Sequence, residues 1–236
     1  MSRRIAIIVE SLSRWDDSLR SCFESLDAGE RRRADDFACD QSRRRFIAGR
    51  GLLRAILARQ LNCAPAAVRL EMGAHGKPRL AGGRPLKFNL SHSGNRIAVA
   101  LSWEAEIGID IERVRPEISR DIESMAAHAF HPEIGRRLAA LPPPRRRAAF
   151  YRQWTKQEAI LKARGTGFSP AVLSSAPSAV TVRELALGKG WFAAVAAEGD
   201  DFELSIHHGF GTMDFRKPGR YSPASLAARR APEIRR

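Results

Sequence analysis

Three carboxylates and one ammonium group fall in two short stretches of this chain, and their spacing points to phosphate chemistry. In residues 107–112, isoleucines alternate with Gly108, Asp110 and Glu112. A period of two is typical of a β-strand, so the isoleucines should face a core while both acids project from the opposite face. We expect Asp110 to be exposed on that face and to be dispensable for stability.

The second stretch is residues 148–163, which lack proline and glycine and therefore predict a helix. Trp154, Glu158 and Lys162 are four positions apart, which places them on one stripe of that helix. With the two strand acids, Glu158 would complete a set of converging oxygen ligands. Such a set suits a hard divalent cation, and we interpret it as a Mg²⁺ site used with a phosphate substrate.

Each pattern alone also has an ordinary structural explanation. Two acids on one strand face are often solvated, and a Glu–Lys pair at i+4 is a common surface pair on a helix. The chain length of 236 residues allows one large domain or two small ones. The chain is 44% hydrophobic and 28% charged, as in a soluble globular protein.

The formal net charge of +14 predicts partners with negative charge. A polyphosphate ligand, an acidic protein, a nucleic acid and an anionic membrane surface all satisfy this, and charge does not choose among them. The three cysteines are widely spaced, which disfavours a zinc site or a disulfide framework.

The start of the chain predicts a first strand at residues 5–9 rather than a signal peptide, because its apolar run is short. No stretch approaches the roughly 18 to 20 apolar residues that a membrane helix needs. We therefore expect a cytoplasmic protein without membrane contact.

The remaining elements follow from periodicity and turn residues. Further strands are expected at 97–103, 107–112, 180–182, 191–195 and 202–206. Helices are expected at 41–61, at 118–130 and at 148–163, and another helix should end at residue 141. A turn at Glu104–Ala105 predicts a hairpin between the strands at 97–103 and 107–112. Gly165 should end the last helix, and the segment from residue 216 should be a poorly ordered tail.

The helix at 41–61 has one unusual arginine. At roughly 100° per residue, its apolar side chains gather on one face, while Arg43, Arg50 and Arg54 form a separate charged stripe. Arg45 falls inside the apolar arc. An arginine there either extends its charged end to solvent or pairs with an anion.

Four motifs in fixed order carry a resemblance to a known family. They are His75-Gly76-Lys77-Pro78, Phe88-Asn89-Leu90-Ser91-His92-Ser93-Gly94, Gly108-Ile109-Asp110-Ile111-Glu112, and a helix with Trp154, Glu158, Lys162, Gly165 and Gly167. Together, over residues 31–170, they resemble the 4′-phosphopantetheinyl transferases, specifically the long, surfactin-synthetase-activating type.

This resemblance implies an enzyme that moves 4′-phosphopantetheine from coenzyme A to a serine of an apo acyl or peptidyl carrier protein. Mg²⁺ would assist, and adenosine 3′,5′-bisphosphate would be released. It also implies a monomeric α+β pseudo-dimer of two similar α/β halves, each with a small, mainly antiparallel sheet packed on helices. Residues 1–104 would form the half that holds the adenosine and 3′-phosphate of the coenzyme. Residues 105–215 would carry the metal acids and the catalytic helix, and residues 216–236 the basic tail.

The resemblance assigns roles by position. Asp110, Glu112 and Glu158 match the metal-binding acids. Lys162 matches a phosphate-binding lysine. The catalytic group is thus Glu158, Lys162 and Asp110, and the coenzyme-binding group is Arg33, Arg45, Lys77, Pro78, Ser91, His92 and Lys162. Glu158, or a water held by the metal, would accept the serine proton.

The chain departs from the family at two positions that are usually basic, which hold Glu30 and Gln157 here. Two other functions fit parts of the sequence. A basic nucleic-acid-binding protein would explain the charge but lacks a zinc-finger pattern or an aromatic platform, and we expect no specific nucleic acid. A Mg²⁺-dependent hydrolase of nucleotide diphosphates would share the metal acids but use water.

Overall fold

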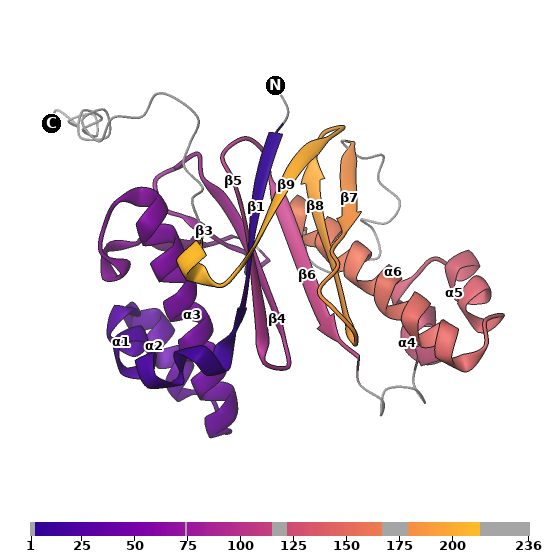
Figure 1. Cartoon of the computed structure of the whole chain (residues 1–236), viewed down its shortest axis with the longest axis horizontal. Helices are drawn as coiled ribbons and strands as arrows, with labels where there is room; N and C mark the ends of the chain where they lie inside the picture. The colour runs from indigo at the N-terminus through magenta and orange to yellow at the C-terminus, as the bar shows by residue number, and fades with distance from the viewer. Residues whose placement is uncertain (1–2, 74, 115–121, 167–178, 213–236) are drawn as a thin grey trace, which may run out of the picture.

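The computed structural model of the chain describes residues 3–73, 75–114, 122–166 and 179–212. Two sheets lie against each other in the middle of the molecule, with helices on both outer sides (Figure 1). In the described part of the chain, no helix is long and apolar enough to cross a membrane. The tail expected at residues 216–236 lies outside the described residues.

The first sheet has the strand order β4-β5-β1-β9. Its strands are β1 (Arg3–Ser11), β4 (Lys87–Ser93), β5 (Arg96–Ser102) and β9 (Phe202–His208). The central strand β1 pairs antiparallel with β5 and parallel with β9. Residues 5–9 are all buried because alternate side chains enter two different cores: Ile8 packs with the helical side, whereas Ile5 and Ile7 pack with the second sheet.

The second sheet has the order β6-β8-β7 and is antiparallel. It consists of β6 (Ile107–Arg113), β7 (Val180–Glu184) and β8 (Trp191–Glu198). Ile107, Ile109 and Ile111 are fully buried between the two sheets, as their alternation predicted. The opposite face of β6 therefore turns toward the outer helices.

The helices form the outer layers. Beside the first sheet lie α1 (Leu19–Ser25), α2 (Ala28–Asp35) and α3 (Asp40–Leu61), and beside the second lie α4 (Ile122–Ala129), α5 (Pro132–Ala139) and α6 (Pro143–Arg164). A short hairpin, β2 (Leu70–Met72) and β3 (Pro78–Leu80), completes the first half. Both long helices, α3 and α6, end at a residue with positive φ, Asn62 and Gly165.

The predicted α+β class with two halves is confirmed, but the hairpin at Glu104–Ala105 is wrong. Strand β5 pairs with β4 and β1, while β6 pairs with β8, so the two strands belong to different sheets. The division of the chain at residue 104 stays a prediction. In space, β9 from the second half of the sequence completes the sheet of the first half.

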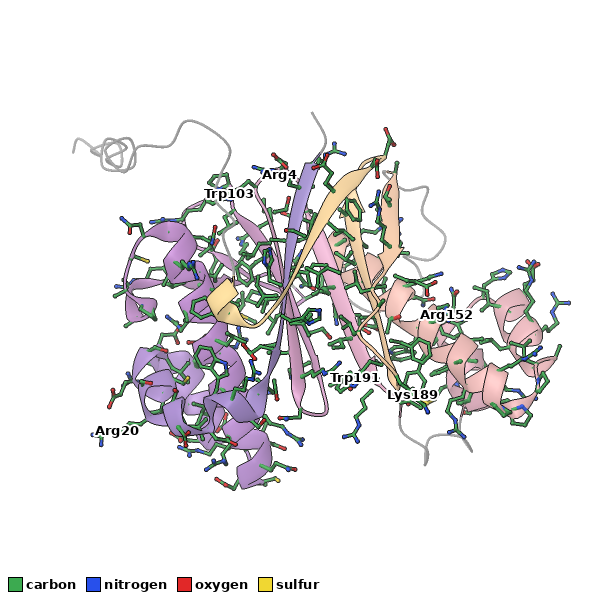
Figure 2. All side chains as sticks on the ribbon, in the orientation of Figure 1. Arg4, Arg20, Trp103, Arg152, Lys189 and Trp191 are labelled. Carbon is green, nitrogen blue, oxygen red and sulfur yellow. The ribbon has the colours of Figure 1, made fainter. Side chains whose placement is uncertain are left out.

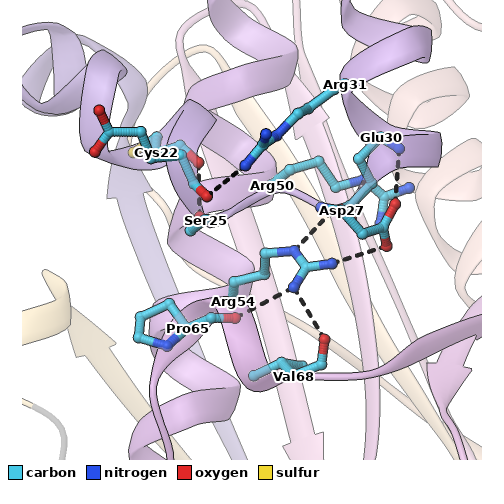
Figure 3. A network of polar contacts seen from close by, with 10 residues as sticks. Cys22, Ser25, Asp27, Glu30, Arg31, Arg50, Arg54, Pro65 and Val68 are labelled. Atoms are coloured by element: carbon cyan, nitrogen blue, oxygen red, sulfur yellow. Dashed lines mark hydrogen bonds and ion pairs between the residues drawn. The ribbon is translucent and has the colours of Figure 1, made fainter.

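The predicted charged stripe of the helix at 41–61 is also wrong in one member, because Arg54 is fully buried. Its guanidinium donates to Glu30 at 2.6 Å, to Asp27 at 2.9 Å and to the carbonyl oxygen of Val68 at 2.9 Å (Figure 3). Asp27 and Glu30 also form the capping box that starts α2. Glu30 thus anchors α2 to α3, which explains why an acid stands there.

Candidate active site

Strand β6 and helix α6 touch backbone to backbone at Gly108. A Cβ atom at this position would lie 2.0 Å from the carbonyl oxygen of Ala159 and 2.3 Å from the amide nitrogen of Ala163. Only glycine allows this approach. Because Glu158 and Lys162 immediately precede these alanines, the contact brings both side chains to the strand that carries the acids.

Asp110 is the centre of the arrangement. Its Oδ1 accepts hydrogen bonds from Lys162 Nζ at 2.6 Å and from Ser91 Oγ at 2.9 Å, and Lys162 Nζ is also 3.3 Å from Ser91 Oγ. The residue is only 3% exposed. The expectation of an exposed Asp110 is therefore wrong, because α6 and β4 cover the face of β6 that carries it. Whether the protein stays folded without this side chain stays a prediction.

A ladder of side-chain oxygens joins the edge strands β4 and β6, which share no backbone pairing. Asn89 Oδ1 accepts the N–H of Ile109 at 2.8 Å, Ser91 Oγ that of Ile111 at 3.3 Å, and Ser93 Oγ that of Arg113 at 3.1 Å. The constant offset of twenty positions means that the strands run parallel. Ser93 Oγ also donates to Glu112 Oε2 at 2.6 Å, as Ser91 does to Asp110. These side-chain contacts, the rungs of the ladder, satisfy backbone N–H groups of the edge strand β6. The two serine rungs also orient the carboxylates of Asp110 and Glu112.

Glu158 lies beside this group on α6 and is partly buried. Desolvation raises the pKa of Glu158; the positive charge of Lys162 opposes the shift, and the negative charge of Asp110 adds to it. Trp154, predicted on the same stripe, instead packs against the rings of Phe130 and Phe150 in the core under α4. Two of the three stripe residues therefore reach the site.

A cavity of about 210 Å³ opens beside Glu158 and Lys162. It is lined by the β2–β3 turn, by β4 and by α6, through His75, Gly76, Lys77, Pro78, Asn89, Leu90, Glu158, Leu161, Lys162 and Gly165. A larger cavity of about 480 Å³ shares four of these residues. Lys77 Nζ is held by Glu106 Oε2 at 3.2 Å and by the carbonyl oxygen of Ile107 at 3.0 Å, and burial lowers the pKa of Lys77.

A second positively charged region surrounds His92. Desolvation lowers the pKa of His92, and the positive charges of Lys162, Arg45 and Arg50 lower it further. Arg45 is partly buried and lines a cavity of about 290 Å³ that also contains Asp16 and Asn95. The structure does not bring Arg33 into this group: its side chain is exposed on α2 and lies over the Phe37 ring.

The site residues do not form a complete metal site in this structure. Among the described residues, no three acidic, histidine or cysteine side chains stand close enough together to hold a metal ion. The ammonium of Lys162 instead contacts Asp110. However, Asp110 Oδ2 is buried and makes no hydrogen bond in the described part of the chain. This orphaned carboxylate oxygen fits a hard cation that prefers oxygen ligands. Glu112 follows two residues along the same strand, and Glu158 is near enough for the charge of Asp110 to raise its pKa.

Sequence reasoning missed three contributors to the site: Asn89, Ser93 and Glu106. The signal for the first two was present, because Asn89, Ser91 and Ser93 alternate with the same period as Asp110 and Glu112. Glu106 had no such signal, since its contacts with Lys77 and with Lys87 Nζ at 2.8 Å join residues distant in sequence.

Comparisons with known proteins identify the family. Residues 106–209 match the family model of the 4′-phosphopantetheinyl transferase superfamily, and residues 13–104 match that of the 4′-phosphopantetheinyl transferase N-terminal region. The chain is 36% identical over 214 residues to the 4′-phosphopantetheinyl transferase HetI of Nostoc sp., covering 84% of this chain and 89% of the relative.

Two other relatives carry the same description. The transferase AcpT of Salmonella typhi is 40% identical over 57% of this chain and 68% of its own length. The 4′-phosphopantetheinyl transferase of Bacillus subtilis is 29% identical over 61% of this chain and 62% of its own length.

Proposed function

This chain belongs to the 4′-phosphopantetheinyl transferases, and we propose that it takes the phosphopantetheinyl group from coenzyme A with the help of Mg²⁺. The acceptor would be the serine of an apo acyl or peptidyl carrier protein, and adenosine 3′,5′-bisphosphate would leave. The observation that carries this proposal is the convergence of Asp110, Glu158 and Lys162 beside a cavity bounded by Lys77 and Pro78.

The main chemical obstacle is charge, because a serine oxygen must approach a phosphorus in an anionic diphosphate. The serine oxygen would bond to the phosphorus that carries pantetheine, and the bond from that phosphorus to the bridging oxygen would break. Lys162 would stabilise the negative charge that develops on the leaving phosphate. Ser91 and His92 would orient the diphosphate, and the Glu158 carboxylate would accept the serine proton.

Asp110, Glu112 and Glu158 would hold Mg²⁺. When bound, Mg²⁺ would neutralise phosphate charge and make the phosphorus more electrophilic. Lys162 also affects this metal site, because its ammonium group forms an ion pair with Asp110 and neutralises its charge. A bound diphosphate would offer Lys162 an alternative partner and release Asp110 to the cation.

The direct test is incubation of the protein with coenzyme A, Mg²⁺ and a panel of apo carrier proteins, read by intact mass. We expect at least one carrier to gain the mass of one phosphopantetheinyl group. This increase in mass should disappear when Mg²⁺ is chelated. Adenosine bisphosphate should appear only when a carrier is present. Release of that product at the same rate without carrier would instead indicate hydrolysis.

The coenzyme 3′-phosphate should contribute strongly to recognition. We propose that Arg45, His92 and Lys77 contact this end of the coenzyme, so dephospho-coenzyme A should be a poor donor. Losing one charge-assisted contact costs on the order of 1.5 to 3 kcal/mol, which corresponds to about a ten- to hundredfold higher KM. Steady-state kinetics with both donors measure this ratio of KM values. Arg45→Gln should bring the KM values of the two donors closer together. Equal KM values for the two donors in the unsubstituted enzyme would show that none of the three residues contacts the 3′-phosphate.

We also propose that arginines on α5 and at the start of α6 dock the acidic carrier. The structure separates two kinds of arginine there. Arg146 donates to the carbonyl oxygens of Ala139 at 2.8 Å and Leu141 at 3.1 Å, and so holds the turn between the helices. Arg136 and Arg145 are exposed and available to a partner.

The double variant Arg136→Glu/Arg145→Glu should therefore raise the carrier KM several-fold and weaken the salt dependence of transfer, because docking by exposed charge is screened. The coenzyme KM should stay unchanged. Arg14→Glu/Arg20→Glu is the matched control, since both residues are exposed and Arg20 lies on the opposite side of the molecule from α5 (Figure 2). Equal carrier KM values for the two double variants at low salt would refute the docking surface.

A further inference from the structure

The ladder between β4 and β6 contains a repeated unit, and the proposed function gives a role to the serine of only one copy, Ser91. In each serine rung, the hydroxyl oxygen accepts the N–H of one β6 residue and its proton goes to the carboxylate of the preceding residue. Ser91 serves Ile111 and Asp110 in this way, and Ser93 serves Arg113 and Glu112. The same local geometry therefore recurs two residues along the strand.

Ser93 is well placed to fix its acid. It is 4% exposed, so water does not compete freely for its hydroxyl, and its bond to Glu112 Oε2 is 2.6 Å long. A hydroxyl has a single proton. The oxygen accepts the backbone N–H of Arg113, and the proton is donated to the Glu112 carboxylate, which can only accept. A glutamate side chain has three rotatable bonds, and this contact removes much of their freedom.

We propose that Ser93 is a positioning residue that orients the Glu112 carboxylate toward the metal, so that Glu112 and Asp110 present their oxygens at a fixed separation. This inference rests on the proposed function, because it needs a cation between the acids. Groups that hydrogen-bond a metal-binding carboxylate typically change metal affinity by about ten- to a hundredfold when removed.

The chain offers a matched control for the purely structural part of this role. Ser102 is a fully buried serine on β5 whose hydroxyl accepts the N–H groups of Glu104 at 3.2 Å and Ala105 at 3.3 Å. Ser102→Ala removes the same atoms from the same first sheet, but away from the acids. The loss of stability that comes only from an unsatisfied backbone N–H should be similar in Ser93→Ala and Ser102→Ala.

The experiment is a titration of the full-length protein with Mn²⁺ in the presence of coenzyme A and without carrier, followed by electron paramagnetic resonance of the free ion. We expect Ser93→Ala to raise the Mn²⁺ dissociation constant about tenfold or more. Ser93→Thr, which keeps the hydroxyl, should restore most of the affinity. Ser102→Ala should bind Mn²⁺ as the unsubstituted protein does, at a comparable loss of Tm. Ser93→Cys, which keeps a weak donor, should fall between Ser93→Ala and the unsubstituted protein and serves if the alanine variant does not fold.

Two results would overturn the inference in distinguishable ways. If Ser93→Ala, or Ser93→Cys in its place, binds Mn²⁺ as tightly as the unsubstituted protein, then Ser93 does not position Glu112, while the metal site itself stands. If the unsubstituted protein binds no Mn²⁺ with coenzyme A present, then the metal part of the proposed function fails and this role of Ser93 fails with it.

Discussion

Replacing Asp110 by asparagine should lower kcat/KM for carrier modification by about a hundred- to a thousandfold, the scale expected when one preorganised charge is removed from a phosphoryl-transfer site. Asparagine preserves the shape of the side chain but leaves Lys162 without its 2.6 Å ion pair. It also removes the charge of the orphaned Oδ2 that a cation would use. Glu158→Gln should behave alike, since it removes the acid opposite Asp110.

The conservative substitution is preferable to alanine because Asp110 is buried. Asp110→Ala would leave Lys162 unpaired and open a gap between β4 and β6, so instability could account for lost activity. Breaking a fully buried pair costs about 3 to 5 kcal/mol, and here the cost should be nearer 1 to 3 kcal/mol because Lys162 keeps 28% exposure. Rates from intact mass should therefore be read beside Tm. A folded Asp110→Asn variant with near-normal turnover would refute the assignment.

Local periodicity predicted the parts of the site that lie within one element. The alternation of isoleucines with Gly108, Asp110 and Glu112 correctly predicted β6 and its buried face. The helical spacing of Glu158 and Lys162 correctly placed them on α6. In both cases the information is contained in neighbours along the chain, so no knowledge of the sheet order was needed.

The errors concern contacts between elements. The hairpin at residues 104–105 failed because a short turn does not specify which edge a strand joins, and β6 found its partner in β8, far along the chain. Arg54 was placed on a charged stripe because a helical projection shows only angles. Its burial depends on Asp27 and Glu30 from α2, whose carboxylates compensate the charge. The burial of Asp110 also depends on other elements, because α6 and β4 cover it, and the alternation within β6 does not show them.

Gly108→Ala should be among the most damaging single-methyl changes in the chain. The added Cβ would meet the carbonyl oxygen of Ala159 at 2.0 Å and the amide nitrogen of Ala163 at 2.3 Å. Both are backbone atoms, so no rotamer change relieves the overlap, and trimming either alanine to glycine would not rescue it. The helix α6 must move away from β6. Overpacking of this kind typically costs about 1 to 3 kcal/mol of unfolding free energy, occasionally more.

The effect on activity should exceed the effect on stability, because Glu158 and Lys162 are direct chain neighbours of the two α6 residues in the displaced contact. A shift of about 1 Å in catalytic groups can lower the rate about a hundredfold. We therefore expect a folded Gly108→Ala enzyme with a lower Tm, a sharply lower kcat and weak Mn²⁺ binding. Gly49→Ala is the control: this buried glycine of α3 would place its Cβ 3.4 Å from the nearest atom, Ile97 Cδ1, and alanine suits a helix interior. Normal kcat and Tm in Gly108→Ala would mean that the backbones of β6 and α6 are farther apart than the structure has them, and the convergence of Asp110, Glu158 and Lys162 would lose its physical cause.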